Sequence, residues 1–144
     1  MRRVLFDSSI YILALRGKAD PALDLRRLAE DAAVWLSAVV LEELYAGTNA
    51  RNRRAVERLE HDFTRAGRIL VPSLSDWTQT GEVLGRLAMK HGYEQIGRGR
   101  LTNDALIAMS AGRLGITVVT ANTRDFARLT EFQAFQWRTV GSLS

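Results

Sequence analysis

The chain has 144 residues, of which 47% are hydrophobic and 25% charged, and these values suit a single globular domain over residues 1–144. The formal net charge is +4, and nearly all cationic residues are arginine, Lys18 and Lys90 being the exceptions, so a polyanionic partner is weakly favoured. The absence of cysteine excludes disulfides and thiolate metal sites. No run approaches the roughly 20 apolar residues of a membrane span, and Asp7 interrupts the only stretch resembling a signal peptide. We expect a cytoplasmic protein.

The N-terminal half alternates short apolar runs with helical patterns. Asp7, Ser8 and Ser9 follow the first run and can cap a helix, while Ser37 is placed to cap another and Pro72 ends a third apolar run. The expected strands are residues 4–6, 33–36 and 69–71, and the expected helices are residues 10–15, 25–30, 38–47 and 51–65.

The C-terminal half continues the alternation. A long helix is expected over residues 75–91 with Trp77 facing inward, followed by a glycine-rich loop over 92–100. Thr102 is placed to cap a helix that continues to 114, before Gly115. A strand over 116–119, a short helix over 122–129 and a last strand over 135–137 complete an α/β pattern with a mostly parallel sheet.

Two aspartates follow strands of this expected sheet. Asp7 follows the first strand, and Asp125 follows the strand over 116–119, three residues after Asn122. Sites of open α/β sheets form at the carboxyl ends of strands, so both positions suit chemistry. The alternatives are structural, since Asp7 can act as a helix cap, and Asn122 can be a cap beside an exposed Asp125.

Three further carboxylates lie within apolar helices. Glu42 and Glu43 interrupt one such helix, and because adjacent helical residues point about 100° apart, at most one of them is expected to face a site. The alternative is that both lie on a solvated stripe. Asp104 stands in the expected first turn of an alanine-rich helix, where the alternative role is favourable charge at the helix N-terminus.

Carboxylates that converge on one point repel each other unless a cation lies between them. An all-oxygen set of ligands suits Mg²⁺ or Mn²⁺, and such an ion can activate water for displacement at phosphorus. The combination of these acidic positions, rather than any one of them, therefore favours a metal-dependent site.

Four motifs in order resemble the PIN-domain family, most closely its VapC-type toxins. They are Val4-Leu5-Phe6-Asp7-Ser8-Ser9, the segment from Ser37 to Gly47 with Glu43 before Leu44, the segment from Asp104 to Ala111, and Thr120-x-Asn122-x-x-Asp125-Phe126. The resemblance extends from Met1 to about Leu129.

The resemblance implies a single PIN-like domain with a twisted, mostly parallel sheet flanked by helices. It implies a Mg²⁺- or Mn²⁺-dependent endoribonuclease, the toxin of a toxin–antitoxin pair, with a VapB-type antitoxin and a homodimer as partners. The implied acidic ligands are Asp7, Glu43, Asp104 and Asp125, supported by Ser9, Thr120 and Asn122. Arg98, Arg100 and Arg124 are possible RNA contacts.

Other functions fit the sequence less well. A catalytically silent PIN-like RNA-binding module would not need all four acidic residues. A phosphoacceptor domain needs a strand-end lysine, and Lys18 and Lys90 are badly placed for that role. A Ser-His-Asp hydrolase is disfavoured because His61 and His91 lie at expected surface positions and no Gly-x-Ser-x-Gly turn is present.

Overall fold

A computed structural model describes residues 2–16, 31–92 and 99–139 of the chain. Its sheet has the strand order β3-β2-β1-β4-β5, and every pair of neighbouring strands is parallel. The expected α/β architecture is therefore confirmed. The strands are β1 (Arg2–Phe6), β2 (Ala32–Ser37), β3 (Ile69–Leu70), β4 (Thr117–Thr120) and β5 (Trp137–Thr139).

Two of the helices that follow these strands begin at serine caps. The Ser37 hydroxyl accepts a hydrogen bond from the Val39 amide, and Ser73 forms a reciprocal capping box with Asp76. Gly67 and Gly115 end helices with positive φ angles of 68° and 67°. The helices are α1 (Ser8–Arg16), α3 (Ala38–Gly47), α4 (Arg53–Ala66), α5 (Leu74–His91), α6 (Gly99–Arg113) and α7 (Thr123–Thr130).

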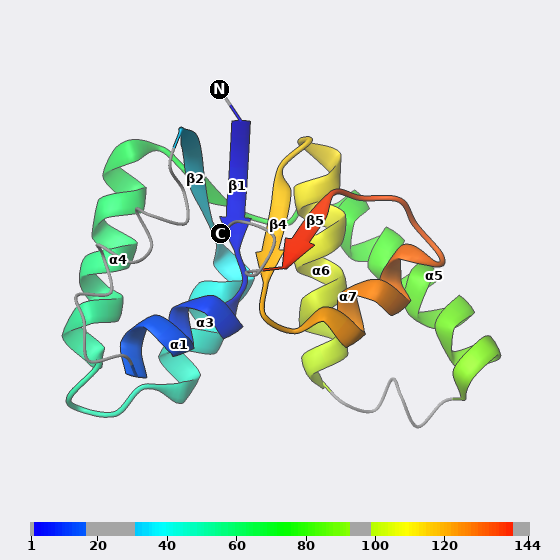
Figure 1. Cartoon of the computed structure of the whole chain (residues 1–144), viewed down its shortest axis with the longest axis horizontal. Coiled ribbons are helices and arrows are strands. Elements are labelled where there is room, and N and C mark those ends of the chain that lie inside the picture. The colour runs from blue at the N-terminus through cyan, green and yellow to red at the C-terminus, as the bar shows by residue number, and fades with distance from the viewer. Residues whose placement is uncertain (1, 17–30, 93–98, 140–144) are drawn as a thin grey trace.

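Helix α6 lies at the centre of the packing. Every residue from Asp104 to Ala111 is buried, as expected of a helix that has neighbours on all sides. It packs against α5, α7, α3 and β4. In Figure 1 the sheet separates α4 from α5 and α6, and β1, the middle strand, contributes the buried Val4, Leu5 and Phe6 to the core.

The strand order reverses beside β1. The chain proceeds outward from β1 to β2 and β3, and then crosses to β4 on the other side of β1. The carboxyl ends of β1 and β4 are therefore the switch point at which α/β folds form their sites. Figure 1 shows α1, α3 and α7 gathered below these strand ends.

Several sequence predictions need correction. Helix α6 begins at Gly99 and not at Thr102, so Asp104 lies beyond the first turn and its expected role at the helix N-terminus is wrong. Trp77 is 54% exposed rather than inward-facing, and the last strand begins at Trp137 instead of residue 135. The expected helix over 25–30 and residues 93–98 of the expected loop lie outside the described residues.

In the part of the chain that the structure describes, no helix combines the length and hydropathy needed to cross a membrane.

Candidate active site

Asp7 is the first residue after β1 and is only 2% exposed. The Ser9 hydroxyl donates to its Oδ1 at 2.5 Å, and the Thr120 hydroxyl donates to its Oδ2 at 2.6 Å. Burial raises the pKa of Asp7 above its usual value, although these two hydroxyls and the backbone amides of Ile10 and Ser9 act in the opposite direction. Asp7 thus caps α1, as one alternative predicted, and is also held rigidly at the switch point.

The two hydroxyls also join neighbouring turns. Ser9 Oγ accepts a hydrogen bond from the Ala121 amide at 3.0 Å, and Thr120 Oγ1 accepts one from the Asn122 amide at 2.8 Å. Each hydroxyl therefore has a fixed donor, and its own proton is directed to Asp7. The β1–α1 turn and the β4–α7 turn are tied together through one carboxylate.

Asp125 is oriented within the same turn of α7. The Asn122 side-chain amide donates to Asp125 Oδ2 at 3.0 Å, and Asp125 is half-buried. Asn122 stands at the N-cap position of α7, but its side chain makes no capping hydrogen bond to the helix. The amide is used to orient the carboxylate instead, as the spacing of three residues predicted.

The two adjacent glutamates of α3 differ in environment. Glu42 is exposed and lies 3.5 Å from the Asn103 amide nitrogen through its Oε2, whereas Glu43 is half-buried. Burial raises the pKa of Glu43, hydrogen bonds from Asn103 and Ser8 lower it, and the negative charges of Glu42 and Asp7 raise it further. Among the described residues, Glu43 Oε1 is buried without a hydrogen-bond partner.

Asp104 lies on α6 and is only 4% exposed. Its neighbour Asn103 interacts with both glutamates of α3, so the N-terminal part of α6 meets the middle of α3. The fold thus brings Glu43 of α3 close to Asp7 at the end of β1, and it places the part of α6 that carries Asp104 against α3.

The donor set fits a hard divalent cation. Glu43 and Asp7 are close enough for their charges to disfavour each other, and Glu43 Oε1 has no hydrogen-bond partner within the described part of the chain. A cation bound between them would relieve both problems. Among residues 2–16, 31–92 and 99–139, no group of three or more histidine, cysteine, aspartate or glutamate side chains is arranged to hold a metal ion.

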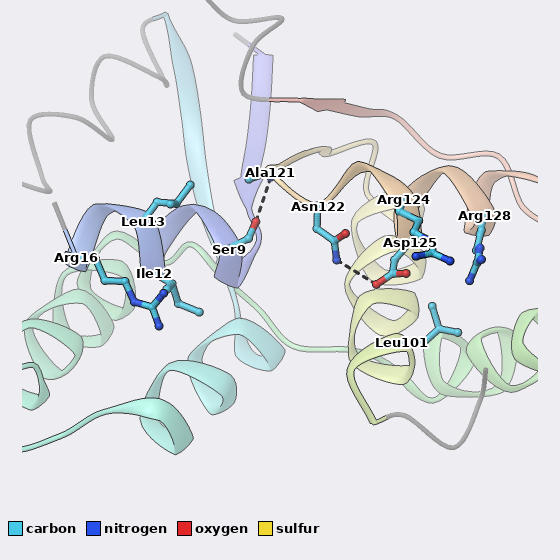
Figure 2. A pocket seen from close by; sticks show the side chains of 10 residues that line it. All are labelled: Ser9, Ile12, Leu13, Arg16, Leu101, Ala121, Asn122, Arg124, Asp125 and Arg128. Atoms are coloured by element: carbon cyan, nitrogen blue, oxygen red, sulfur yellow. Dashed lines mark hydrogen bonds between the residues drawn. The ribbon is translucent and has the colours of Figure 1, made fainter. Parts of the chain in front are cut away.

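Two hollows adjoin these carboxylates. The larger, of about 960 Å³, lies between α1 and α7 and is lined by Ser9, Asn122 and Asp125 (Figure 2). The smaller, of about 350 Å³, is lined by Glu43. Ile12 and Arg16 of α1 line both, so this face of α1 separates the two spaces.

The three arginines expected to contact RNA differ in whether the structure describes their side chains. Arg124 lines the larger hollow. Arg98 and the side chain of Arg100 lie outside the described part of the molecule. The sequence patterns did not predict a role for Ser8 and Asn103, which donate hydrogen bonds to Glu43, or for Arg16 and Arg128, which line the larger hollow. The position of Ser8 beside Asp7 and of Asn103 beside Asp104 was the available signal.

A parallel sheet with this strand order and acidic side chains at its switch point defines an α/β protein with a candidate metal-dependent site. The family model described as "PIN domain" matches residues 4–131, and the chain belongs to this family. The resemblance found in the four sequence motifs is thereby confirmed.

Solved structures share the fold over nearly the whole chain. One is DNA-bound VapBC from Salmonella typhimurium, with 23% identity, a TM-score of 0.70, and coverage of 97% of this chain and 99% of that chain. Another is VapBC2 from Rickettsia felis bound to a promoter DNA fragment, with 24% identity, a TM-score of 0.64, and coverage of 95% and 98%. FitAcB from Neisseria gonorrhoeae has 25% identity, a TM-score of 0.63, and coverage of 96% and 98%. Comparison with curated protein sequences finds no match.

Proposed function

We propose that the protein is a Mg²⁺- or Mn²⁺-dependent endoribonuclease. The observation that carries this proposal is the pairing of Asp7, held on both oxygens by hydroxyls, with Glu43, whose buried Oε1 has no hydrogen-bond partner among the described residues. A buried carboxylate and a half-buried one that repel each other form an unfavourable arrangement in a purely structural role. They are suited to binding a cation beside a phosphodiester.

Asp7, Glu43, Asp104 and Asp125 are the proposed ligands. A bound Mg²⁺ or Mn²⁺ would supply Lewis-acid stabilisation of charge at phosphorus and activation of water. Ser9 and Thr120 fix the direction of the Asp7 lone pairs, and Asn122 fixes Asp125. In hydrolysis, the oxygen of water bonds to phosphorus while the bond to the leaving oxygen breaks, and that oxygen is released as an alcohol.

The test is cleavage of a fluorescent single-stranded RNA by highly purified protein. Cleavage is expected with Mg²⁺ or Mn²⁺, to stop in excess EDTA, and to fall at least about a hundredfold in Asp104→Asn at saturating metal. Mn²⁺ binding followed by electron paramagnetic resonance should weaken in the same variant. Metal-independent cleavage, or wild-type rates in the variant, would contradict the proposal, and RNA binding without cleavage would favour the silent RNA-binding module.

The proposed partners are a VapB-type antitoxin and a second copy of this chain. The support is family membership and the structural neighbours, which include VapBC and FitAB complexes. Light scattering at micromolar concentration should give the mass of a dimer. Expression of the chain alone should arrest bacterial growth, and co-expression of a small DNA-binding protein encoded beside it should restore growth. A monomer would contradict the first expectation, and unimpaired growth with the chain alone would contradict the second.

A further inference from the structure

The larger hollow has arginines at both of its ends. Arg16 stands at the end of α1, and Arg124 and Arg128 stand on α7. Figure 2 shows Ser9, Asn122 and Asp125 between these two groups. Asp125, the acidic residue of the candidate active site that lines this hollow, therefore lies between them, and positive charge flanks it on either side.

The spacing along both helices directs these side chains to the same space. Arg124 and Arg128 are four residues apart and share one face of α7. On α1, Ser9, Ile12 and Arg16 succeed one another at intervals of three and four residues, and all three line the hollow. Arg16 and Arg124 are exposed, and neither forms a salt bridge with another described residue.

The surface between Ser9 and Arg16 is apolar. Ile12 is 36% exposed and Leu13 is 57% exposed, and both line the hollow. Apolar side chains suit the faces of unstacked bases, whereas a phosphate would remain unsatisfied there. One flank thus offers an apolar stretch that ends in the guanidinium of Arg16, and the other flank offers the exposed guanidinium of Arg124.

We infer that a single polynucleotide strand crosses the hollow from α1 to α7, with Arg16 binding a phosphate on one side of the scissile bond and Arg124 binding a phosphate on the other. This inference rests on the proposed function and deepens it by specifying how the strand is held. Guanidinium groups bind phosphate oxygens bidentately, so the two contacts fix the register of the strand over the carboxylates. A strand bound on both sides is cut internally rather than from an end.

The test measures binding without cleavage. A fluorescein-labelled single-stranded oligoribonucleotide is titrated by anisotropy, in EDTA and at several salt concentrations, with wild type, Arg16→Gln, Arg124→Gln and the double variant. Each single variant should bind more weakly and flatten the log–log salt slope by about 0.7, the value for one phosphate contact on a single strand. Arg86→Gln is the matched control, because Arg86 is an exposed arginine of α5 that lines neither hollow.

The double variant tests whether the contacts lie on separate phosphates. If they do, its change in slope equals the sum of the two single changes. A double variant no different from the single variants would mean that both arginines contact one phosphate, and slopes unchanged from wild type would remove them from the interface. A poly-glutamate competitor as effective as unlabelled oligonucleotide at equal charge would overturn the inference in favour of an acidic protein partner.

Cleavage assays separate this inference from the proposed function. If wild type cleaves RNA but the arginine variants have the same salt slope as wild type, only the two-sided binding is contradicted. If the variants show the expected change in slope but wild type never cleaves RNA, only the proposed function is contradicted.

Discussion

Glu42 and Glu43 are adjacent and chemically identical, yet their environments differ. Glu42 is exposed, whereas Glu43 is half-buried and feels the charge of Asp7. We expect Glu43→Gln to lower RNA cleavage at least about a hundredfold, and Glu42→Gln, a surface change, to leave it within about threefold. The measurement is cleavage of a fluorescent RNA at saturating metal, with folding checked by circular dichroism. The reverse ranking would place the wrong glutamate in the site.

The same residue makes a prediction about stability in the absence of metal. The pKa of Glu43 is raised by burial, so between its usual value near 4.5 and the raised value the folded state binds more protons than the unfolded state. The contribution of Glu43 to stability is therefore lost as pH rises through this window. In EDTA, Glu43→Gln should unfold at a higher temperature than wild type at neutral pH, and the difference should shrink on acidification. A lower melting temperature at neutral pH would contradict this electrostatic explanation.

Thr120 acts on Asp7 through one hydroxyl group, which allows a matched pair of variants. Thr120→Val removes the hydroxyl at nearly constant volume, while Thr120→Ser keeps it. Loss of a hydrogen bond to a metal ligand costs about tenfold to a hundredfold in metal affinity, so Thr120→Val should bind Mn²⁺ that much more weakly. Thr120→Ser should stay near wild type in a Mn²⁺ titration. Equal losses in both variants would indicate a packing role instead.

At the scale of elements, one ion pair joins the start of α5 to the end of α6. Asp76 is 1% exposed and accepts three hydrogen bonds from Arg113, at 3.0 to 3.1 Å. Burial raises the pKa of Asp76, but Arg113 and Ser73 together outweigh burial, and the pKa lies below its usual value of 3.8. The pair therefore stabilises the α5–α6 packing while Asp76 is charged.

Because the pKa of Asp76 is lowered on folding, its stabilising contribution is present above about pH 4 and is lost as pH falls through the lowered value. Asp76→Asn should reduce this acid sensitivity. Arg113→Gln should cost about 2 kcal/mol at neutral pH, less than for a fully buried pair because Arg113 is partly exposed. Urea unfolding at several pH values measures both effects. Arg86→Gln serves as the control, and an equal loss in that variant would contradict a specific ion pair.

The start of α6 shows why some elements could not be predicted from the sequence. Glycines at 97 and 99 favour a loop, yet the helix begins at Gly99. The helix is buried against several neighbours, and tertiary packing of this kind overrides a local propensity of about 1 kcal/mol for glycine. The prediction that Trp77 faces inward was wrong for a different reason, because helical spacing does not reveal which face of a helix a neighbouring element covers.

The candidate site was predictable to the extent that it follows from topology. Asp7 and Thr120 end neighbouring parallel strands, so the strand-end rule brings them together. The contacts of Asn103 with Glu42 and Glu43 join α6 to α3, some 60 positions apart in the chain. No periodicity encodes such a tertiary contact. The same is true of Arg16, whose role depends on how α1 faces α7.

At the scale of the whole molecule, metal binding should stabilise the fold. A ligand that binds only the folded state at a hundred times its Kd adds about 2.7 kcal/mol to the free energy of unfolding. We expect this gain with Mn²⁺ in wild type and Glu42→Gln and expect it to disappear in Asp7→Asn. Urea unfolding followed by circular dichroism, with and without EDTA, gives the difference. Full stabilisation of Asp7→Asn would place the ion elsewhere.

The tie between the β1–α1 and β4–α7 turns has a kinetic consequence. Ala121 is exposed, yet its amide proton is bonded to Ser9 Oγ, whose own proton is bonded to Asp7. An amide at such a surface position ordinarily exchanges with deuterium as soon as solvent reaches it. Here exchange requires the two turns to separate, so the Ala121 amide signal reports how often the site comes apart. The exchange rate of this amide therefore measures how often the two turns separate, and it should fall whenever a bound ligand holds them together.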